Sequence, residues 1–141
     1  MHSFSEREFN LLETARVGRL ATFGATGTDG RLRPHCVPVC FALHDGLLWI
    51  AIDEKPKSNR KLRRIRNIEE NPAVTLLVDH YEDDWTNLWF LMVEGTALYS
   101  SLKPGVLAEL RRRYPQYRTM ALDHGISVRP ERTVSWSATK P

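Results

Sequence analysis

A cluster of cations in the middle of the chain is the feature best suited to chemistry with an anion. Positions 55 to 66 hold seven lysines and arginines and no acid. Free N–H groups and the helix dipole favour negative charge where a helix begins, and Lys and Arg add charge-assisted hydrogen bonds. The sequence therefore predicts an anion site at a loop-to-helix junction, formed by Lys55, Lys57, Ser58, Asn59 and Arg60. A solvated basic helix face remains the alternative.

The two cysteines and a nearby histidine are weaker candidates. Cys36 and Cys40 lie four residues apart in an extended stretch, a separation of about 13 Å in a strand. A disulfide needs Cα atoms about 5.5 Å apart, so the two cannot pair. His35 and Cys36 are neighbours and point to opposite faces of a strand. We therefore expect two buried free thiols and no metal site.

Catalytic motifs and a nucleotide-binding loop are not evident. The five histidines lie in separate predicted elements, without a Ser-His-Asp or His-Glu-x-x-His arrangement, so no catalytic residue is predicted. Gly24, Gly27 and Gly30 have a Gly-x-x-Gly-x-x-Gly spacing that differs from the dinucleotide fingerprint, and we expect a hairpin with Asp29 and Gly30 at its tip. An enzyme of this kind would rely on a cofactor for its chemistry.

Length and composition indicate one globular domain over residues 1–141. The hydrophobic and charged fractions, 42% and 26%, are ordinary for globular chains. Apolar runs such as 74–78 and 88–93 are far shorter than the roughly 20 residues of a membrane helix, and the first residues do not resemble a signal peptide. We expect a cytoplasmic protein without a membrane partner. Aromatic residues are not interleaved with the cations, which argues against nucleic-acid binding.

Hydrophobic periodicity predicts a mainly β protein with inserted α-helices. Helices are expected after the capping box Ser5–Glu8, around 62–68 before Asn71-Pro72, and over 103–113. Six strands are expected, and Pro34 and Pro38 make the second an edge strand or a bulged one. Their ranges are 19–23, 31–43, 47–52, 73–80, 88–99 and 131–138, with 114–129 irregular. Strands joined mainly by hairpins favour an antiparallel barrel.

Several segments, taken in order, resemble a known superfamily. Val17–Thr22 and Arg33–Phe41 resemble the opening strands of the pyridoxamine 5′-phosphate oxidase-like, FMN-binding split-barrel proteins. Asp53–Ile68, Asn71-Pro72 and Leu77–Tyr81 followed by Trp85 resemble its branch of deazaflavin (coenzyme F420)-dependent enzymes. Glu94–Ala97 and Val134–Trp136 fit as well, so that the similarity runs from about Leu11 to Ser137.

This resemblance implies a six-stranded antiparallel split β-barrel and a homodimer with two cofactor sites at the subunit interface. The strand that carries Val37, Pro38 and Val39 would line the flavin ring. The phosphate would face Lys55, Lys57, Ser58 and Arg60, with Asn59 beside them. Trp85 or Trp89 would approach the ring or the substrate, one option being from the other subunit, and interface core is the alternative for both.

The function implied is that of an F420-dependent oxidoreductase, which transfers hydride between the deazaflavin and a small organic substrate. The chain lacks the Arg-Leu-x-Pro tail of true pyridoxamine phosphate oxidases, so oxidation of vitamin B6 is not expected. F420 carries glutamates beyond its phosphate. The cations that continue past the phosphate site favour it over FMN; they are Arg60, Lys61, Arg63 and Arg64. The alternatives are an FMN-dependent oxidoreductase and a non-catalytic carrier of flavin, F420 or haem.

Overall fold

The computed structural model describes residues 2–53 and 61–139. Its elements, in chain order, are α1 (Glu6–Thr14), β1 (Gly18–Thr22), β2 (His35–Val39), β3 (Ala42–His44), β4 (Leu47–Ala51), α2 (Arg63–Glu70), β5 (Ala73–His80), the 3₁₀ helix η1 (Trp85–Asn87), β6 (Trp89–Ser101), α3 (Pro104–Arg113), the 3₁₀ helix η2 (Pro115–Thr119) and β7 (His124–Ser137). Of the helices within these residues, none is long and apolar enough to span a membrane.

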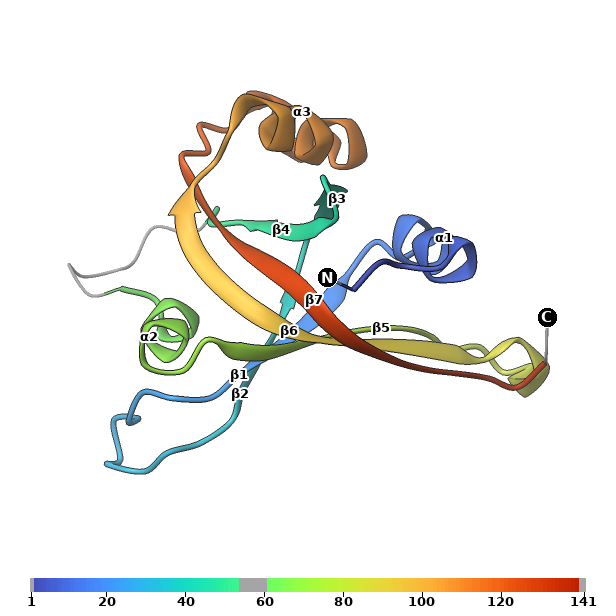
Figure 1. Cartoon of the computed structure of the whole chain (residues 1–141), viewed down its shortest axis with the longest axis horizontal. Helices are drawn as coiled ribbons and strands as arrows, with labels where there is room; N and C mark the ends of the chain where they lie inside the picture. Colours follow the sequence, from blue (N-terminus) through green and yellow to red (C-terminus); the bar gives the residue numbers. More distant parts are fainter. Residues whose placement is uncertain (1, 54–60, 140–141) are drawn as a thin grey trace.

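The strands form one antiparallel sheet that curls into a split barrel (Figure 1). Its order is β2-β1-β5-β6-β7-β4-β3, which places β2 and β3 at opposite edges. Only Cys40 and Phe41 separate these two strands in the chain, so the sheet must bend round until its edges meet. The mainly β split barrel predicted from the sequence is confirmed. The strand count of six is wrong, because the predicted strand 31–43 divides into β2 and β3.

Side chains replace ladder hydrogen bonds where the chain crosses from one sheet edge to the other. The N–H of Phe41 donates to the hydroxyl oxygen of Tyr114 at 3.0 Å, and Arg113 Nε donates to the carbonyl of Phe41 at 2.9 Å. The Phe41 side chain is itself buried. Burying these backbone groups without partners would be costly, so the end of α3 stabilises the crossing.

The local signals for the helices and turns are confirmed. Ser5 and Glu8 form the expected capping box at the start of α1. The basic helix α2 buries Ile65 and Ile68 and ends before Pro72. The glycine-rich segment turns back through the predicted hairpin, in which the N–H of Gly30 donates to the carbonyl of Gly27 at 3.0 Å.

Two apolar clusters hold the barrel and α3 together. The first lies inside the barrel and includes Leu12 of α1 and Ile68 of α2. The second lies between α3 with η2 and the outer face of β3 and β4, and includes Trp49 and Leu110. Because both faces of β4 are covered, this strand is apolar along its whole length, as the sequence predicts.

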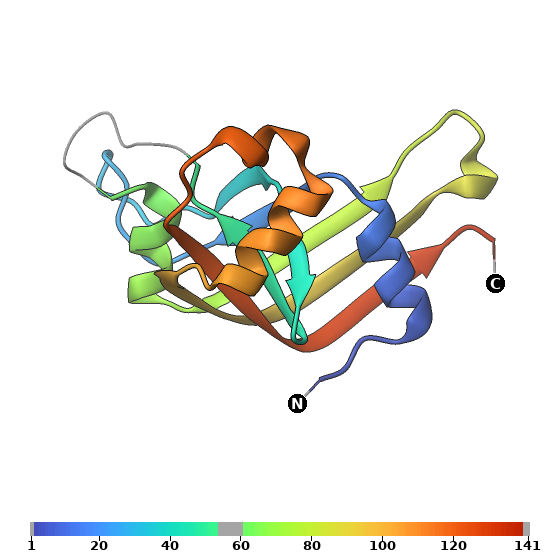
Figure 2. The same cartoon turned by 90° about the horizontal axis from the view of Figure 1, so that it is seen from above.

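The long strands β6 and β7 extend beyond the barrel on the side of α1, and they carry this end of the molecule away from α2 (Figure 2). Residues 124–129 belong to β7, so the prediction that 114–129 is irregular is wrong at its end. Pro130 lies opposite Gly95 at a register shift, and a Cβ on Gly95 would be 2.3 Å from the carbonyl oxygen of Arg129. Because this bulge contains a proline and the charged Arg129, the sequence there does not show the pattern expected of a strand.

Candidate functional site

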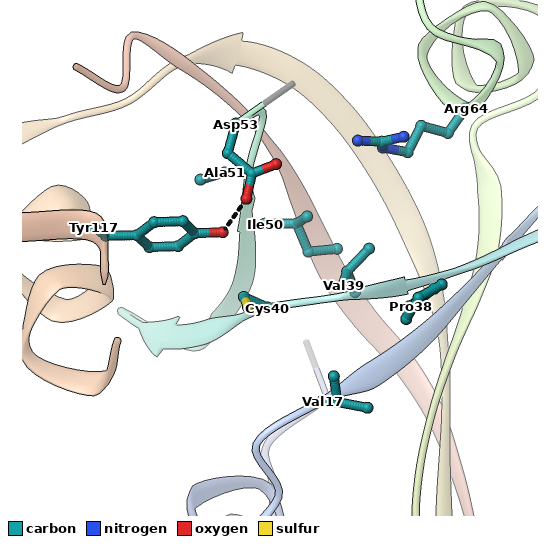
Figure 3. Close-up of a pocket in the computed structure, with 9 residues that line it drawn as sticks. All are labelled: Val17, Pro38, Val39, Cys40, Ile50, Ala51, Asp53, Arg64 and Tyr117. Carbon is teal, nitrogen blue, oxygen red and sulfur yellow. Dashed lines mark hydrogen bonds between the residues drawn. The ribbon is translucent and has the colours of Figure 1, made fainter. Parts of the chain in front are cut away.

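A pocket of about 150 Å³ opens where the sheet edges approach each other (Figure 3). We call it the split pocket. It draws residues from the segment before β1, from β2 and β4, and from α2 and η2, so the curling of the sheet is what forms it. Its lining residues are Val17, Pro38, Val39, Cys40, Ile50, Ala51, Asp53, Arg64 and Tyr117.

One wall of the split pocket is apolar and belongs to the strand β2. Pro38 is exposed and borders the pocket, and β2 is an edge strand paired only with β1 among the described strands. A proline has no N–H, so it is tolerated where a strand edge is not continued by a further ladder. Val39 and Ile50 are buried beneath this wall. The wall suits a flat apolar group.

Among the described residues that line the split pocket, the cation is Arg64, which comes from the first turn of α2. Only 7% of Arg64 is exposed, and its guanidinium is directed toward the pocket (Figure 3). Arg64 precedes Ile68 by four residues, so the helical repeat places both on the inner side of the helix. A guanidinium is an always charged donor and suits phosphate or carboxylate groups.

The opposite side of the split pocket is formed by Asp53 and Tyr117. The Tyr117 hydroxyl donates to Asp53 Oδ2 at 2.6 Å (Figure 3). Burial raises the pKa of the Tyr117 hydroxyl first, and the Asp53 carboxylate and the Cys40 thiol raise it further. Tyr117 therefore keeps its proton at neutral pH. Cationic and acceptor groups thus lie across the pocket from each other.

His35 does not add to the positive charge near Arg64. Burial lowers the pKa of the His35 imidazole, and the positive charges of Arg63 and Arg64 lower it further. The imidazole is therefore mostly neutral at pH 7, and among the described residues the positive charges that act on it are those of Arg63 and Arg64.

Comparison with known proteins identifies the fold and the family. The family model described as pyridoxamine 5′-phosphate oxidase matches residues 5–137. The chain belongs to the pyridoxamine 5′-phosphate oxidase family. A comparison with curated protein sequences gives no match.

Solved structures share this family fold over nearly the whole chain. A conserved hypothetical protein of Mycobacterium tuberculosis, Rv2991, is 27% identical with a TM-score of 0.70, over 96% of this chain and 86% of the other. The heme storage protein HutZ of Vibrio cholerae is 16% identical, with a TM-score of 0.65 and coverage of 96% and 95%. The FAD binding protein of Mycobacterium smegmatis is 18% identical, with a TM-score of 0.60 and coverage of 96% and 97%.

The predicted site residues on β2 lie at the split pocket with one exception. Pro38 and Val39 line it, whereas Val37 packs against the barrel core. The five predicted anion-binding residues lie outside the described part of the chain, and their role stays a prediction; they are Lys55, Lys57, Ser58, Asn59 and Arg60.

The predicted tryptophans are at the other end of the molecule. Trp85 is in η1, and Trp89 begins β6 and stacks on His80. The N–H of Ala138 donates to the carbonyl of Leu88 at 3.0 Å, so this end lies beside the C-terminal segment, far from α2 in Figures 1 and 2. Within one chain these tryptophans do not reach the split pocket.

Seven pocket residues are absent from the predicted site, and four of them carry polar or ionisable groups: Cys40, Asp53, Arg64 and Tyr117. The sequence does contain a signal for Arg64, because its spacing of four residues from Ile68 places it on the inner side of the helix. The sequence contains no such signal for Tyr117, because its segment shows no clear periodicity.

The expectation of two buried thiols is wrong for Cys36, which is exposed, and Cys40 is only half-buried. Strand alternation turns Cys36 outward with Pro38. Residues 2–53 and 61–139 contain no group of three or more His, Cys, Asp or Glu suited to a metal ion.

Proposed function

We propose that this protein binds a phosphorylated flavin-type cofactor in the split pocket and is an oxidoreductase that transfers hydride between that cofactor and a small organic substrate. The observation that carries the proposal is the composition of the pocket. An apolar wall at Pro38 stands beside the buried guanidinium of Arg64, which matches a flat ring joined to an anionic group. The FAD binding relative with the same fold supports the cofactor class.

The size of the split pocket supports a site completed by a second subunit. Pockets that hold drug-sized ligands measure roughly 300–1,000 Å³, whereas the split pocket measures about 150 Å³. One chain would therefore enclose only part of a flavin nucleotide. Exposed aromatic side chains at the other end, Trp85 and Trp136, are available to a partner. We propose a two-fold symmetric dimer in which this end of one subunit approaches the split pocket of the other.

For the cofactor itself we propose F420, with FMN as the alternative. The resemblance of residues 53–85 to F420-dependent proteins supports F420. Two of the cations that the sequence offers to the glutamate tail of F420 already have partners within the chain. Lys61 pairs with Glu69 at 2.7 Å, and Arg63 donates to the carbonyl of Ala25 at 2.9 Å. The positive charge at these residues is therefore weaker support for F420 than the sequence indicates. FMN needs one anion-binding position, and Arg64 is suited to that role.

The bound cofactor would supply the hydride chemistry. The protein's own groups would bind and orient it: Arg64 would neutralise an anionic group, and the wall at Pro38 and Val39 would exclude water from one side of the ring. No protein side chain has to form a covalent bond in such a reaction. Tyr117 retains its proton and contributes a fixed polar group.

Replacement of Arg64 tests the proposed binding mode. In Arg64→Met, the affinity for FMN and F420 should fall by roughly ten- to a hundredfold, as expected for a hydrogen bond to a charged group. Riboflavin, which has the same ring as FMN and no phosphate, should bind parent and variant alike. Arg112→Met, at an exposed arginine, is the matched control. Equal weakening of FMN and riboflavin, with an unchanged melting temperature, would contradict a role for Arg64 at the phosphate.

A carrier without turnover is the second candidate, and the fold shared with the heme storage protein HutZ favours it. The two functions differ in the fate of the reduced cofactor. An oxidoreductase should oxidise bound reduced F420 or FMN faster when a quinone or an enone is added. Tight binding without acceleration across a broad acceptor panel would support the carrier, and so would preferential binding of haem.

A further inference from the structure

We propose that Asp53 fixes the Tyr117 hydroxyl as a hydrogen-bond acceptor, and that the pair recognises the imide N–H of the cofactor ring. This inference rests on the proposed function and adds a specificity element to it. The imide N–H is the ring N–H donor that oxidised flavin and deazaflavin have in common, so the recognition would serve either cofactor.

The direction of the hydrogen bond follows from the two groups. A hydroxyl has one proton and two lone pairs, and an ionised carboxylate only accepts. The bond of 2.6 Å from Tyr117 to Asp53 Oδ2 therefore uses the only proton of the hydroxyl. Toward a ligand in the split pocket, the hydroxyl oxygen can therefore only accept a hydrogen bond. The second carboxylate oxygen of Asp53 is a further acceptor. Both residues line the pocket.

The position of Tyr117 is fixed by its surroundings. Only 4% of the residue is exposed, and it belongs to the apolar cluster between α3 and β4. Its ring lies 5.6 Å from that of Tyr114, measured between centroids. A side chain packed in this way cannot turn its hydroxyl elsewhere without disturbing the cluster, so the acceptor is preorganised.

The electrostatics keep the hydroxyl in this state. Burial and the Asp53 carboxylate both raise the pKa of Tyr117, so the proton stays on the hydroxyl and remains directed at Asp53. Cys40 raises the pKa of Tyr117 as well.

Arg64 makes the two sides of the split pocket chemically different. A guanidinium has donors and no acceptor, so the side at Arg64 selects acceptors and anions. The side at Asp53 and Tyr117 selects donors. A ligand with an N–H in its ring and an anionic group elsewhere satisfies both, whereas one with acceptors at both ends leaves the Asp53 side without a partner, which is costly in a buried site.

The test is a cycle between a protein variant and a ligand variant. Binding of FMN and of N3-methyl-FMN, which lacks the imide proton, is measured for the parent and for Tyr117→Phe. If the hydroxyl accepts from the imide N–H, the effects of removing either group should not be additive. Tyr117→Phe should lower the affinity for FMN by about tenfold and leave the affinity for N3-methyl-FMN almost unchanged. Tyr99→Phe is the control. Tyr99 is on strand β6, stacks on His124 and does not line the split pocket, so this change should affect neither affinity.

Asp53→Asn provides the second variant. It leaves the aromatic ring of Tyr117 in place, so it serves if Tyr117→Phe fails to fold. An asparagine amide can donate to the Tyr117 hydroxyl oxygen, so that the hydroxyl proton is free to point into the pocket. This variant should also lower the affinity for FMN by about tenfold and leave the affinity for N3-methyl-FMN almost unchanged. If the parent binds only F420, the same variants are compared with F420.

The other possible outcomes contradict either this inference alone or the proposed function as well. Unchanged FMN affinity in both variants, or equal weakening of FMN and N3-methyl-FMN, contradicts recognition of the imide by Asp53 and Tyr117 and leaves the proposed function intact. A parent that binds neither FMN nor F420 contradicts the proposed function itself, and this inference with it.

Discussion

The side-chain amide of Asn67 donates to the hydroxyl of Thr22 at 2.9 Å, and both side chains are buried. The carbonyl oxygen of the same amide accepts from the N–H of Ala25 at 2.8 Å and from Arg63 Nε at 3.2 Å. Asn67 therefore joins α2 to β1 and to the hairpin after it. Because Arg64 is on the same short helix, this residue also determines where the pocket cation lies.

Asn67→Ala should lower both stability and cofactor affinity. Loss of the side chain leaves the Ala25 N–H and the Thr22 hydroxyl without these partners, at a cost of about 2–4 kcal/mol in the free energy of unfolding. Urea unfolding measures it, and Asn10→Ala, at an exposed position of α1, should stay within about 0.5 kcal/mol of the parent. A similar small effect for both variants would show that α2 is held by its apolar contacts alone.

Arg113 and Arg112 are neighbours on α3 with opposite expected effects. Arg113 is buried and donates to the carbonyls of Phe41, Glu13 and Ala15 at 2.9, 3.1 and 2.6 Å. Arg113→Met removes this donor from the three carbonyls and the buried partner of the Glu13 carboxylate, and should cost about 3–5 kcal/mol in the free energy of unfolding. Arg112 is exposed and pairs with Glu109 at 2.9 Å, so Arg112→Met should cost at most about 1 kcal/mol. Equal losses would contradict the assignment of the structural role to Arg113.

The pKa of His35 predicts a loss of stability on mild acidification. Burial, and then the charges of Arg63 and Arg64, lower this pKa below the usual 6.5. Between the lowered value and 6.5 the unfolded chain binds more protons, so the free energy of unfolding falls as the pH drops through that window and is fully present above it. His35→Gln should lose less stability than the parent between about pH 7.5 and 5.5. Parallel pH profiles in urea unfolding would contradict this.

The sequence predicts most of the fold because its signals are local. The capping box at Ser5, the strand 73–80 and the stop at Asn71-Pro72 need only neighbouring residues, and all are observed. The division of the predicted strand 31–43 depends instead on Arg113 and Tyr114, which lie more than 70 residues away and satisfy the backbone of Phe41.

The residues of the candidate site also fall into those with a local signal in the sequence and those without one. Pro38 and Val39 are readable as part of a recognisable strand, and Arg64 can be found from its helical spacing. The contact between Asp53 and Tyr117 joins residues 64 positions apart, in a segment without periodicity. A contact of that kind forms only when α3 and η2 pack on β4, so a single sequence carries no local signal for it.

Assembly can be tested at the aromatic end of β6 and β7. Trp85 is 66% exposed and Trp136 49% exposed, and Trp136 stacks on Phe90 at 6.3 Å between centroids. In a dimer with an interface above about 1,000 Å², Trp85→Asp with Trp136→Asp should shift the protein toward monomer. Leu32→Asp, at an exposed leucine of the β1–β2 hairpin, should not. Light scattering at micromolar concentration measures both, and a monomeric parent would contradict the shared site.

The central claim is that the split pocket binds a phosphorylated flavin-type cofactor, and an equilibrium titration tests it most directly. F420, FMN and haem are titrated side by side into the unmodified protein, with riboflavin as the ligand that lacks a phosphate. We predict saturable binding of F420 or FMN at one cofactor per subunit, tighter than riboflavin by roughly tenfold or more because of the anion contact. Binding of haem alone, or of riboflavin as tightly as of FMN and F420, would contradict the claim.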